Sequence, residues 1–249
     1  MEIGFLFFSV ILGGVLAYSI SNKKYIPHIL AFSGAFLLAI TLFEVLPKLQ
    51  TLPGKTLGVY ILIGIVIQFI LDFFSKGAEH GHFHTTKSSI FPWAMAFSLC
   101  IHAFLEGMIA NEGYLWLGIA IHKIPIALIL THFLQTSYSK STVAFFLIVF
   151  AVMSPLGSFV GISPELQPYF NKMSAITVGI LLHVSTTILF ESSKDHSFNL
   201  SKLISIFFFL GLISIVDANI INSQSIPFKF ITLRFDDQYF IIYVKENSG

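Results

Sequence analysis

Charged residues are scarce in this chain. Asp, Glu, Lys and Arg together make up 11% of its 249 residues, whereas an average soluble domain has about 25%. Hydrophobic residues make up 55%, and the mean hydropathy is +0.83. A soluble core would leave much of this apolar surface exposed, so the composition indicates a protein surrounded by membrane lipid. The net charge of +1 excludes a strongly basic protein, and we expect no nucleic-acid partner.

Cysteine is almost absent as well. Cys100 stands alone, so no intrachain disulfide can form. Residues 1–18 are apolar but lack the basic segment that precedes the apolar core of a secretion signal. We therefore expect them to begin a first membrane-spanning helix rather than a leader that is removed.

Eight apolar stretches approach the length of about 20 residues that a helix needs to cross a bilayer. They cover residues 3–21, 27–46, 57–75, 91–110, 114–135, 142–162, 172–191 and 202–219. The sequence therefore predicts an all-α, polytopic membrane protein with eight transmembrane helices in one domain, residues 1–219. A homodimer is compatible with this pattern.

Lysines predict the orientation, because cytoplasmic loops are enriched in basic residues. With the N-terminus outside, the cytoplasmic loops hold Lys23, Lys24, Lys76, Lys87, Lys140, Lys194 and Lys202, and the outer loops hold Lys48, Lys55 and Lys172. An even number of spans returns the C-terminus to the same side. We expect a multi-pass protein of the cell membrane with both termini outside.

Residues 220–249 differ from the spans. They mix apolar, aromatic and charged residues, and Asp236–Asp237 interrupts two stretches with strand character. A small β-hairpin and a tail that lies on a surface both fit this pattern. Neither interpretation predicts a role for the tail.

Two histidines and a glutamate occur at matched depth inside the spans. Charged groups in hydrocarbon are costly, so those that occur usually face a polar interior and carry function. His102 and Glu106 are four residues apart, which places them on one face of a helix. His102 lies nine residues before the break at 111–113, and His122 lies nine residues after it. The break is short enough to make the two helices antiparallel neighbours, so both histidines lie near the middle of the bilayer.

We expect His102, Glu106 and His122 to bind one divalent metal ion, because nitrogen and oxygen ligands of this mix suit zinc, iron, manganese or cobalt. The alternative is structural: buried histidines often only make helix–helix hydrogen bonds, and Glu106 can pair with Lys123. Lys123 follows His122 directly. Its ammonium beside a carboxylate would act as a tethered cation in the place of a second metal ion.

Four further titratable residues extend the polar path. His183 lies near the middle of the seventh stretch, where it completes the site or lines the path. Glu44 lies at the outer end of the second stretch, where it could attract an incoming cation. Asp72 and Glu191 lie near the inner ends of the third and seventh stretches, where they could receive a departing one. For Glu44, Asp72 and Glu191, a solvated helix end is an equally good interpretation.

The loop after the third stretch is rich in histidine, with His80, His82 and His84 at alternate positions. Clustered histidines in a loop bind transition metals weakly and exchangeably. The lysine pattern places this loop in the cytoplasm, where it could collect metal that leaves the path.

These residues carry a resemblance to the ZIP family (Zrt/Irt-like proteins), which move zinc, iron and related divalent cations toward the cytoplasm. The segment His102–Gly107 resembles the family's fourth-helix His-Asn-x-x-Glu/Asp-Gly pattern, and His122–Pro125 resembles its fifth-helix pattern. Residues 34–47 resemble the second helix, and residues 154–161 resemble the sixth. The eight spans, the outer termini and the histidine-rich loop also match, so the resemblance covers residues 1–218.

The chain departs from the family pattern at Ala103, Lys123 and Ile126, where the family usually has asparagine, an acidic or amide residue, and often a carboxylate. In the family these positions build a second metal site and bridge it to the first. The resemblance therefore implies a single metal site formed by His102, Glu106 and His122, and completed by Glu44, His183 or water.

Three hypotheses follow. The first is a transporter without enzymatic activity, whose substrate is zinc, iron, manganese or cadmium and whose midplane site alternately faces the two sides of the membrane. The second is a zinc-dependent intramembrane hydrolase, in which three histidines hold a metal-activated water and Glu106 is the base; the histidines would be His102, His122 and His183. No His-Glu-x-x-His segment supports it. The third is a metal sensor that does not transport, motivated by the departures from the family pattern.

Overall fold

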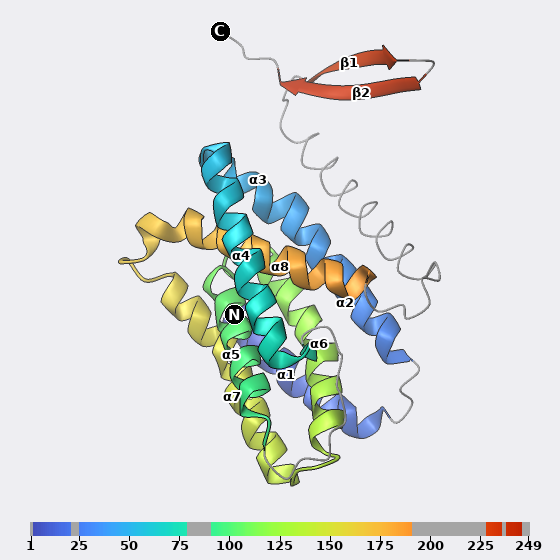
Figure 1. The fold of residues 1–249 in the computed structure, drawn as a ribbon, viewed down its shortest axis with the longest axis vertical. Coiled ribbons are helices and arrows are strands. Elements are labelled where there is room, and N and C mark those ends of the chain that lie inside the picture. The colour runs from blue at the N-terminus through green and yellow to red at the C-terminus, as the bar shows by residue number, and fades with distance from the viewer. Residues whose placement is uncertain (1, 21–24, 79–90, 191–227, 236–237, 246–249) are drawn as a thin grey trace. The chain divides into compact units, whose positions relative to one another are not determined.

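The computed structural model describes residues 2–20, 25–78, 91–190, 228–235 and 238–245 (Figure 1). Its helices are α1 (Glu2–Ser19), α2 (Ile26–Ile40), the π-helix η2 (Thr41–Val45), α3 (Leu46–Lys48), the 3₁₀-helix η3 (Leu49–Thr51), α4 (Gly54–Ser75), α5 (Trp93–Met108), α6 (Leu115–Leu134), α7 (Lys140–Gly161), the 3₁₀-helix η5 (Gln167–Tyr169) and α8 (Phe170–Phe190). The strands β1 (Phe228–Phe235) and β2 (Gln238–Lys245) are the other elements within the described residues.

Five helices are long and apolar enough to cross a membrane, namely Ile26–Thr51, α4, α6, α7 and Gln167–Phe190. In α4 only 17% of the most apolar stretch is buried inside the protein. Its outer face carries large side chains such as Phe69 and Phe73, which are 68% and 76% exposed. An apolar surface of this extent is stable only against lipid. The chain is therefore a multi-pass α-helical membrane protein.

The predicted count of eight spans is not confirmed. α1 and α5 occupy the expected first and fourth spans, but they are shorter apolar helices than the five above. The expected eighth span, residues 202–219, lies outside the described residues.

The second span is longer than predicted. It continues to Thr51 rather than ending near residue 46, and it passes through Pro47. A proline inside a helix lacks an N–H group and its ring crowds the carbonyl one turn earlier. The turn before Pro47 is the π-helix η2, where the Leu46 N–H donates to the Thr41 carbonyl oxygen. This wider turn makes room for the ring, so the helix does not end there.

Close helix pairs form around small residues. α5 packs against α7, and α4 packs against α8. Gly107 of α5 meets the backbone carbonyl of Ser154 on α7, and Gly64 of α4 meets the backbone carbonyl of Ile176 on α8, so a β-carbon at either glycine would collide with backbone. The Ser154 hydroxyl also donates to the Ala103 carbonyl oxygen at 2.8 Å. Small residues of this kind let membrane helices approach closely.

The expected fourth and fifth spans, α5 and α6, are neighbours through their side chains rather than through close backbone contact. α5 and α6 are consecutive, but α5 packs mainly on α7 and α4, whereas α6 packs mainly on α1 and α2. The connection between them, residues 109–114, is not a minimal hairpin: it holds a series of turns and a positive φ of 51° at Gly113. Side chains, polar ones such as Glu106 and Lys123 and apolar ones such as Leu99 and Ile126, therefore join α5 and α6 in place of close backbone contact.

The C-terminal residues form a separate compact unit. The chain divides into residues 1–209 and 210–249. Within the second unit β1 and β2 pair antiparallel, with Phe228 opposite Lys245 and Phe235 opposite Gln238. The register places the connection at positions 236 and 237, which lie outside the described residues.

Candidate metal centre

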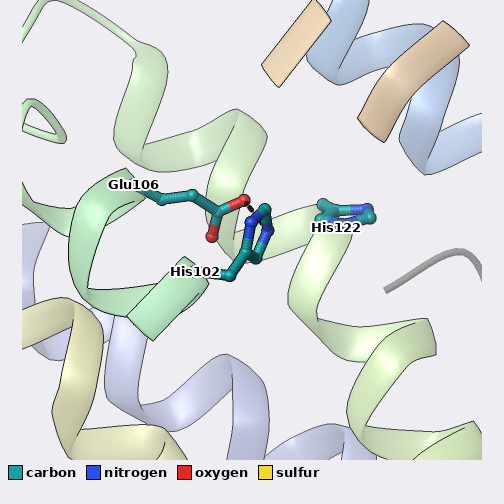
Figure 2. Close-up of side chains that lie close together, drawn as sticks. All are labelled: His102, Glu106 and His122. Atoms are coloured by element: carbon teal, nitrogen blue, oxygen red, sulfur yellow. Dashed lines mark ion pairs between the residues drawn. The ribbon is translucent and has the colours of Figure 1, made fainter. Parts of the chain in front are cut away.

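Three buried side chains meet between α5 and α6. His102 and Glu106 come from successive turns of α5, and His122 comes from α6 (Figure 2). Each offers one ligand atom, and these atoms all lie within 4.8 Å of one another. The exposed fractions of the three residues are 3%, 0% and 2%. Within the described residues this is the one group of three or more His, Cys, Asp or Glu side chains with such geometry.

The Glu106 carboxylate is shared between two partners. Its Oε1 atom lies 2.9 Å from Nε2 of His102, and its Oε2 atom lies 2.9 Å from Nζ of Lys123. The Lys123 ammonium also lies 5.0 Å from the centre of the Phe150 ring, close enough for a cation–π interaction. The structural alternative, a Glu106–Lys123 ion pair, is thus present in the same place as the ligand cluster.

A small cavity of about 10 Å³ accompanies the cluster, room for about one water molecule or one ion. Its lining consists of Leu99, His102, Glu106, His122, Lys123, Ile126 and Phe150. Two imidazoles and one carboxylate are the ligands found in many zinc sites, and a water molecule can complete the coordination. Ile126 contributes only an apolar wall, so the position after Pro125 supplies no ligand.

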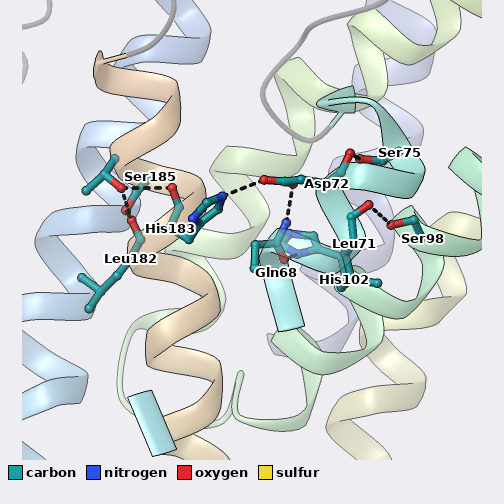
Figure 3. Close-up of polar contacts among 10 residues, drawn as sticks. Gln68, Leu71, Asp72, Ser75, Ser98, His102, Leu182, His183 and Ser185 are labelled. Atoms are coloured by element: carbon teal, nitrogen blue, oxygen red, sulfur yellow. Dashed lines mark hydrogen bonds and ion pairs between the residues drawn. The ribbon is translucent and has the colours of Figure 1, made fainter. Parts of the chain in front are cut away.

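A chain of hydrogen bonds reaches His102 from two other helices (Figure 3). Nδ1 of His102 lies 2.8 Å from Oε1 of Gln68 on α4. Nε2 of Gln68 donates to Oδ1 of Asp72 at 2.8 Å. Oδ2 of Asp72 lies 2.7 Å from Nε2 of His183 on α8. His183 and Asp72, both singled out from the sequence, therefore join the centre indirectly and lie outside the group of three.

Gln68 is the residue that sequence reasoning missed. It is fully buried in α4, and it carries no charge to mark it among apolar neighbours. One signal was available: Gln68 lies four residues before Asp72, so the two side chains share one face of the helix. What the spacing could not reveal is that this face turns toward His102.

Glu44 lies apart from the cluster. Its Oε1 atom accepts a hydrogen bond from the backbone N–H of Tyr114 at 2.9 Å, and Lys48 lies 3.8 Å from the same oxygen. Lys48 also lies 3.5 Å from Glu112. Glu44 thus holds the start of α6 in the structure, next to the 109–114 connection. The remaining predicted residues, Glu191, His80, His82 and His84, lie outside the described residues.

A comparison with protein-family models gives one further finding. Residues 75–216 match the model of a family described as ZIP zinc transporters. The match covers more than half of the chain and includes α5 to α8, and so His102, Glu106 and His122. A comparison with curated proteins finds no match.

Proposed function

Because the chain belongs to the ZIP zinc transporter family, we propose that it carries divalent metal ions, above all zinc, toward the cytoplasm through a site formed by His102, Glu106 and His122. Iron, manganese and cadmium ions have related ligand preferences and are further candidate substrates. The observation that carries this proposal is the meeting of three buried ligand atoms within 4.8 Å in a membrane protein. Buried ionisable groups inside a membrane usually mark an ion path.

Alternating access is the transport mode that the packing around the site supports. In α5, Leu99 belongs to one cluster of buried hydrophobic residues, and Ile109, the residue after this helix, belongs to another. In α6, Ile126 belongs to the first cluster and Ile119 to the second. The candidate ligands lie between these positions on both helices. Apolar packing therefore separates them from both ends of the bundle, so an ion can reach or leave them only when a cluster opens. We propose that the two clusters open one at a time.

A single bound ion is the stoichiometry that we propose. In the family pattern, acidic or amide side chains at the positions of Lys123 and Ile126 build a second site. Here the Lys123 ammonium lies 2.9 Å from one Glu106 oxygen and Ile126 offers no ligand. The tethered cation occupies the side of Glu106 where a second ion would be held.

The orientation that we propose rests on the loop charges, and the direction toward the cytoplasm on the family resemblance. Lysines are concentrated in the loops that are cytoplasmic when the N-terminus lies outside. We therefore place both termini outside the cell membrane. In this orientation Asp72 and His183 lie on the cytoplasmic side of the site and Glu44 on the outer side.

The hydrolase hypothesis finds little support. It needs three histidines around one metal ion, whereas His183 bonds to Asp72 and lies outside the group formed by His102, Glu106 and His122. The sensor hypothesis keeps one observation in its favour, because the Lys123–Glu106 pair competes with an ion for the carboxylate. Tight zinc binding by a protein that moves no zinc would establish a sensor.

Flux into proteoliposomes tests the transport proposal. Wild-type protein should move zinc, and the variants His102→Ala, Glu106→Ala and His122→Ala should each lose most of this flux. His28→Ala is the matched control, because His28 is exposed on α2 and should leave flux unchanged. Iron, manganese and cadmium are tested in the same vesicles to rank the substrates. If all three variants transport zinc like the wild type, this site does not carry the ion.

A further inference from the structure

The hydrogen-bond chain that ends at His102 favours one arrangement of protons between Asp72, Gln68 and His102. An ionised carboxylate can only accept hydrogen bonds, so Asp72 Oδ1 faces the amino group of Gln68, at 2.8 Å. This turns the Gln68 carbonyl oxygen toward His102. A carbonyl oxygen also only accepts, so Nδ1 of His102, at 2.8 Å, is a nitrogen that carries a hydrogen.

The opposite orientation of the Gln68 amide is disfavoured. It would place the Gln68 carbonyl oxygen against the Asp72 carboxylate, so two acceptors would face each other at hydrogen-bond distance. Gln68 is fully buried, and a buried polar group left without a partner costs about 1–3 kcal/mol. Asp72 thus selects the orientation of the amide, and the amide selects the protonated nitrogen of His102.

The far end of the chain keeps Asp72 in place. Nε2 of His183 donates to Asp72 Oδ2 at 2.7 Å, which ties α4 to α8. One turn from Gln68, the Ser98 hydroxyl donates to the Leu71 carbonyl oxygen at 2.6 Å, which ties α4 to α5. The spacing between Gln68 and His102 is therefore set by two helix contacts as well as by their own bond.

We propose that Gln68 and Asp72 are positioning residues that hold His102 with its hydrogen on Nδ1, so that the Nε2 lone pair is directed to the metal ion. Nε2 is the nitrogen that lies 2.9 Å from Glu106 Oε1, on the side of the cluster. Without a metal ion a second hydrogen, on Nε2, keeps two acceptors from facing each other, and a bound ion takes the place of this hydrogen while the one on Nδ1 stays. The inference rests on the proposed transport site. It adds two residues, neither of which touches the ion, that determine how well His102 binds it.

Zinc affinity of the purified protein, measured by titration calorimetry, gives the first test. Gln68→Leu removes the acceptor and should weaken zinc binding about 10- to 100-fold, as loss of a ligand-orienting partner commonly does. Gln68→Glu is the matched control. A carboxyl group of the same length can share a proton with Asp72 and still accept from His102, so this variant should bind zinc almost as the wild type does. Asp72→Asn frees the amide to turn and should give an intermediate loss.

Nitrogen NMR of protein labelled with ¹⁵N-histidine gives a readout that a merely structural role would not change. The His102 signals are identified by their loss in His102→Gln. In the wild type, with and without zinc, Nδ1 of His102 should be protonated. In zinc-loaded Asp72→Asn a second set of His102 signals should appear, from protein in which Nε2 carries the hydrogen and Nδ1 does not.

The outcomes separate the two proposals. An unprotonated His102 Nδ1 in the wild type, or wild-type zinc affinity in Gln68→Leu, overturns the positioning role. Wild-type zinc affinity in His102→Ala instead overturns the metal site. Because the NMR measurement is also made without zinc, it decides the state of Nδ1 even if the protein binds no metal.

Discussion

Glu106 stands at the centre of the candidate metal centre because its two oxygens face different partners. Oε1 lies beside His102 and is directed toward the ligand cluster, whereas Oε2 lies beside the Lys123 ammonium. Both Glu106 and Lys123 are removed from water, with exposed fractions of 0% and 2%. Each charge therefore depends on the other, since an unpaired charge in such a place is strongly destabilising.

Lys123→Met should reveal this dependence. Without zinc the variant should unfold at a lower temperature than the wild type, because loss of one partner of a buried ion pair commonly costs about 3–5 kcal/mol. Zinc should restore much of this stability, because a bound cation takes over the Glu106 charge. Removal of the neighbouring positive charge should also tighten zinc binding, by about tenfold or more. Thermal unfolding with and without zinc, together with calorimetry, measures these effects.

Lys140→Met provides the comparison for this experiment. Lys140 is exposed at the start of α7, so its replacement should change neither the unfolding temperature nor zinc affinity. Weaker zinc binding in Lys123→Met would show that the lysine assists the site rather than competing with an ion.

At the residue scale, the sequence predicted the cluster of His102, Glu106 and His122 but not the hydrogen bond between Gln68 and His102. The spacing of His102, Glu106 and His122 about the 111–113 break was enough to bring them to one depth, because depth in a helix follows from residue number. Gln68 could not be found in this way. Its role depends on which face of α4 meets α5, and that is decided by packing between segments far apart in the sequence.

The helix pair α4 and α8 shows how small residues bring the polar chain together. Gly64 of α4 lies against the backbone of Ile176, and Gly179 of α8 lies against the backbone of Ile61. This close approach allows His183 on α8 to reach Asp72 on α4 at 2.7 Å. The contact between these helices and the polar network are therefore coupled.

Gly64→Ala should accordingly destabilise the protein. The new β-carbon would overlap the Ile176 carbonyl oxygen, and overpacking of this kind costs about 1–3 kcal/mol. Zinc affinity should fall together with the stability, because α4 carries Gln68 and Asp72. Gly58→Ala is the matched control on the same helix, where a β-carbon meets no atom within 4 Å. A Gly64→Ala protein that melts at the same temperature as Gly58→Ala would contradict this account of the α4–α8 contact.

At the element scale, hydropathy located most of the spans, but it placed the end of the second one too early. The apolar stretch ends at residue 46, just before Pro47, and proline usually interrupts a helix. The wider turn of the π-helix η2 makes room for the ring of Pro47, and the span continues to Thr51. Such a local change in helix type depends on the surrounding packing, so the apolar pattern did not reveal it.

At the scale of the whole molecule, the two apolar clusters that enclose the site suggest a test of alternating access. The chain's single cysteine, Cys100, can be replaced by alanine, and Ile119→Cys and Ile126→Cys can then be introduced one at a time. Both side chains are buried, at 0% and 3% exposure. We expect a membrane-impermeant thiol reagent to reach the cysteine at 119 only from outside and that at 126 only from inside. Zinc should change the two labelling rates in opposite directions.

Tyr114→Cys serves as the reference for full labelling from outside, because Tyr114, at the end of the 109–114 connection, is 64% exposed. A cysteine at 119 or 126 that reacts from both sides of the membrane would indicate a continuous channel. That result would contradict alternating access while leaving the metal cluster in place.

The sequence by itself determined that this chain is a helical membrane protein and which three residues form the cluster. Hydrophobic content forces the helices into lipid, and helical rise converts residue number into depth. The tertiary structure decided what surrounds the cluster: α5 and α6 meet through side chains without close backbone contact, α4 brings Gln68 to His102, and Glu44 holds the start of α6. These outcomes depend on how helices pack sideways, and lateral packing is set by small residues and backbone contacts that no single helix pattern encodes.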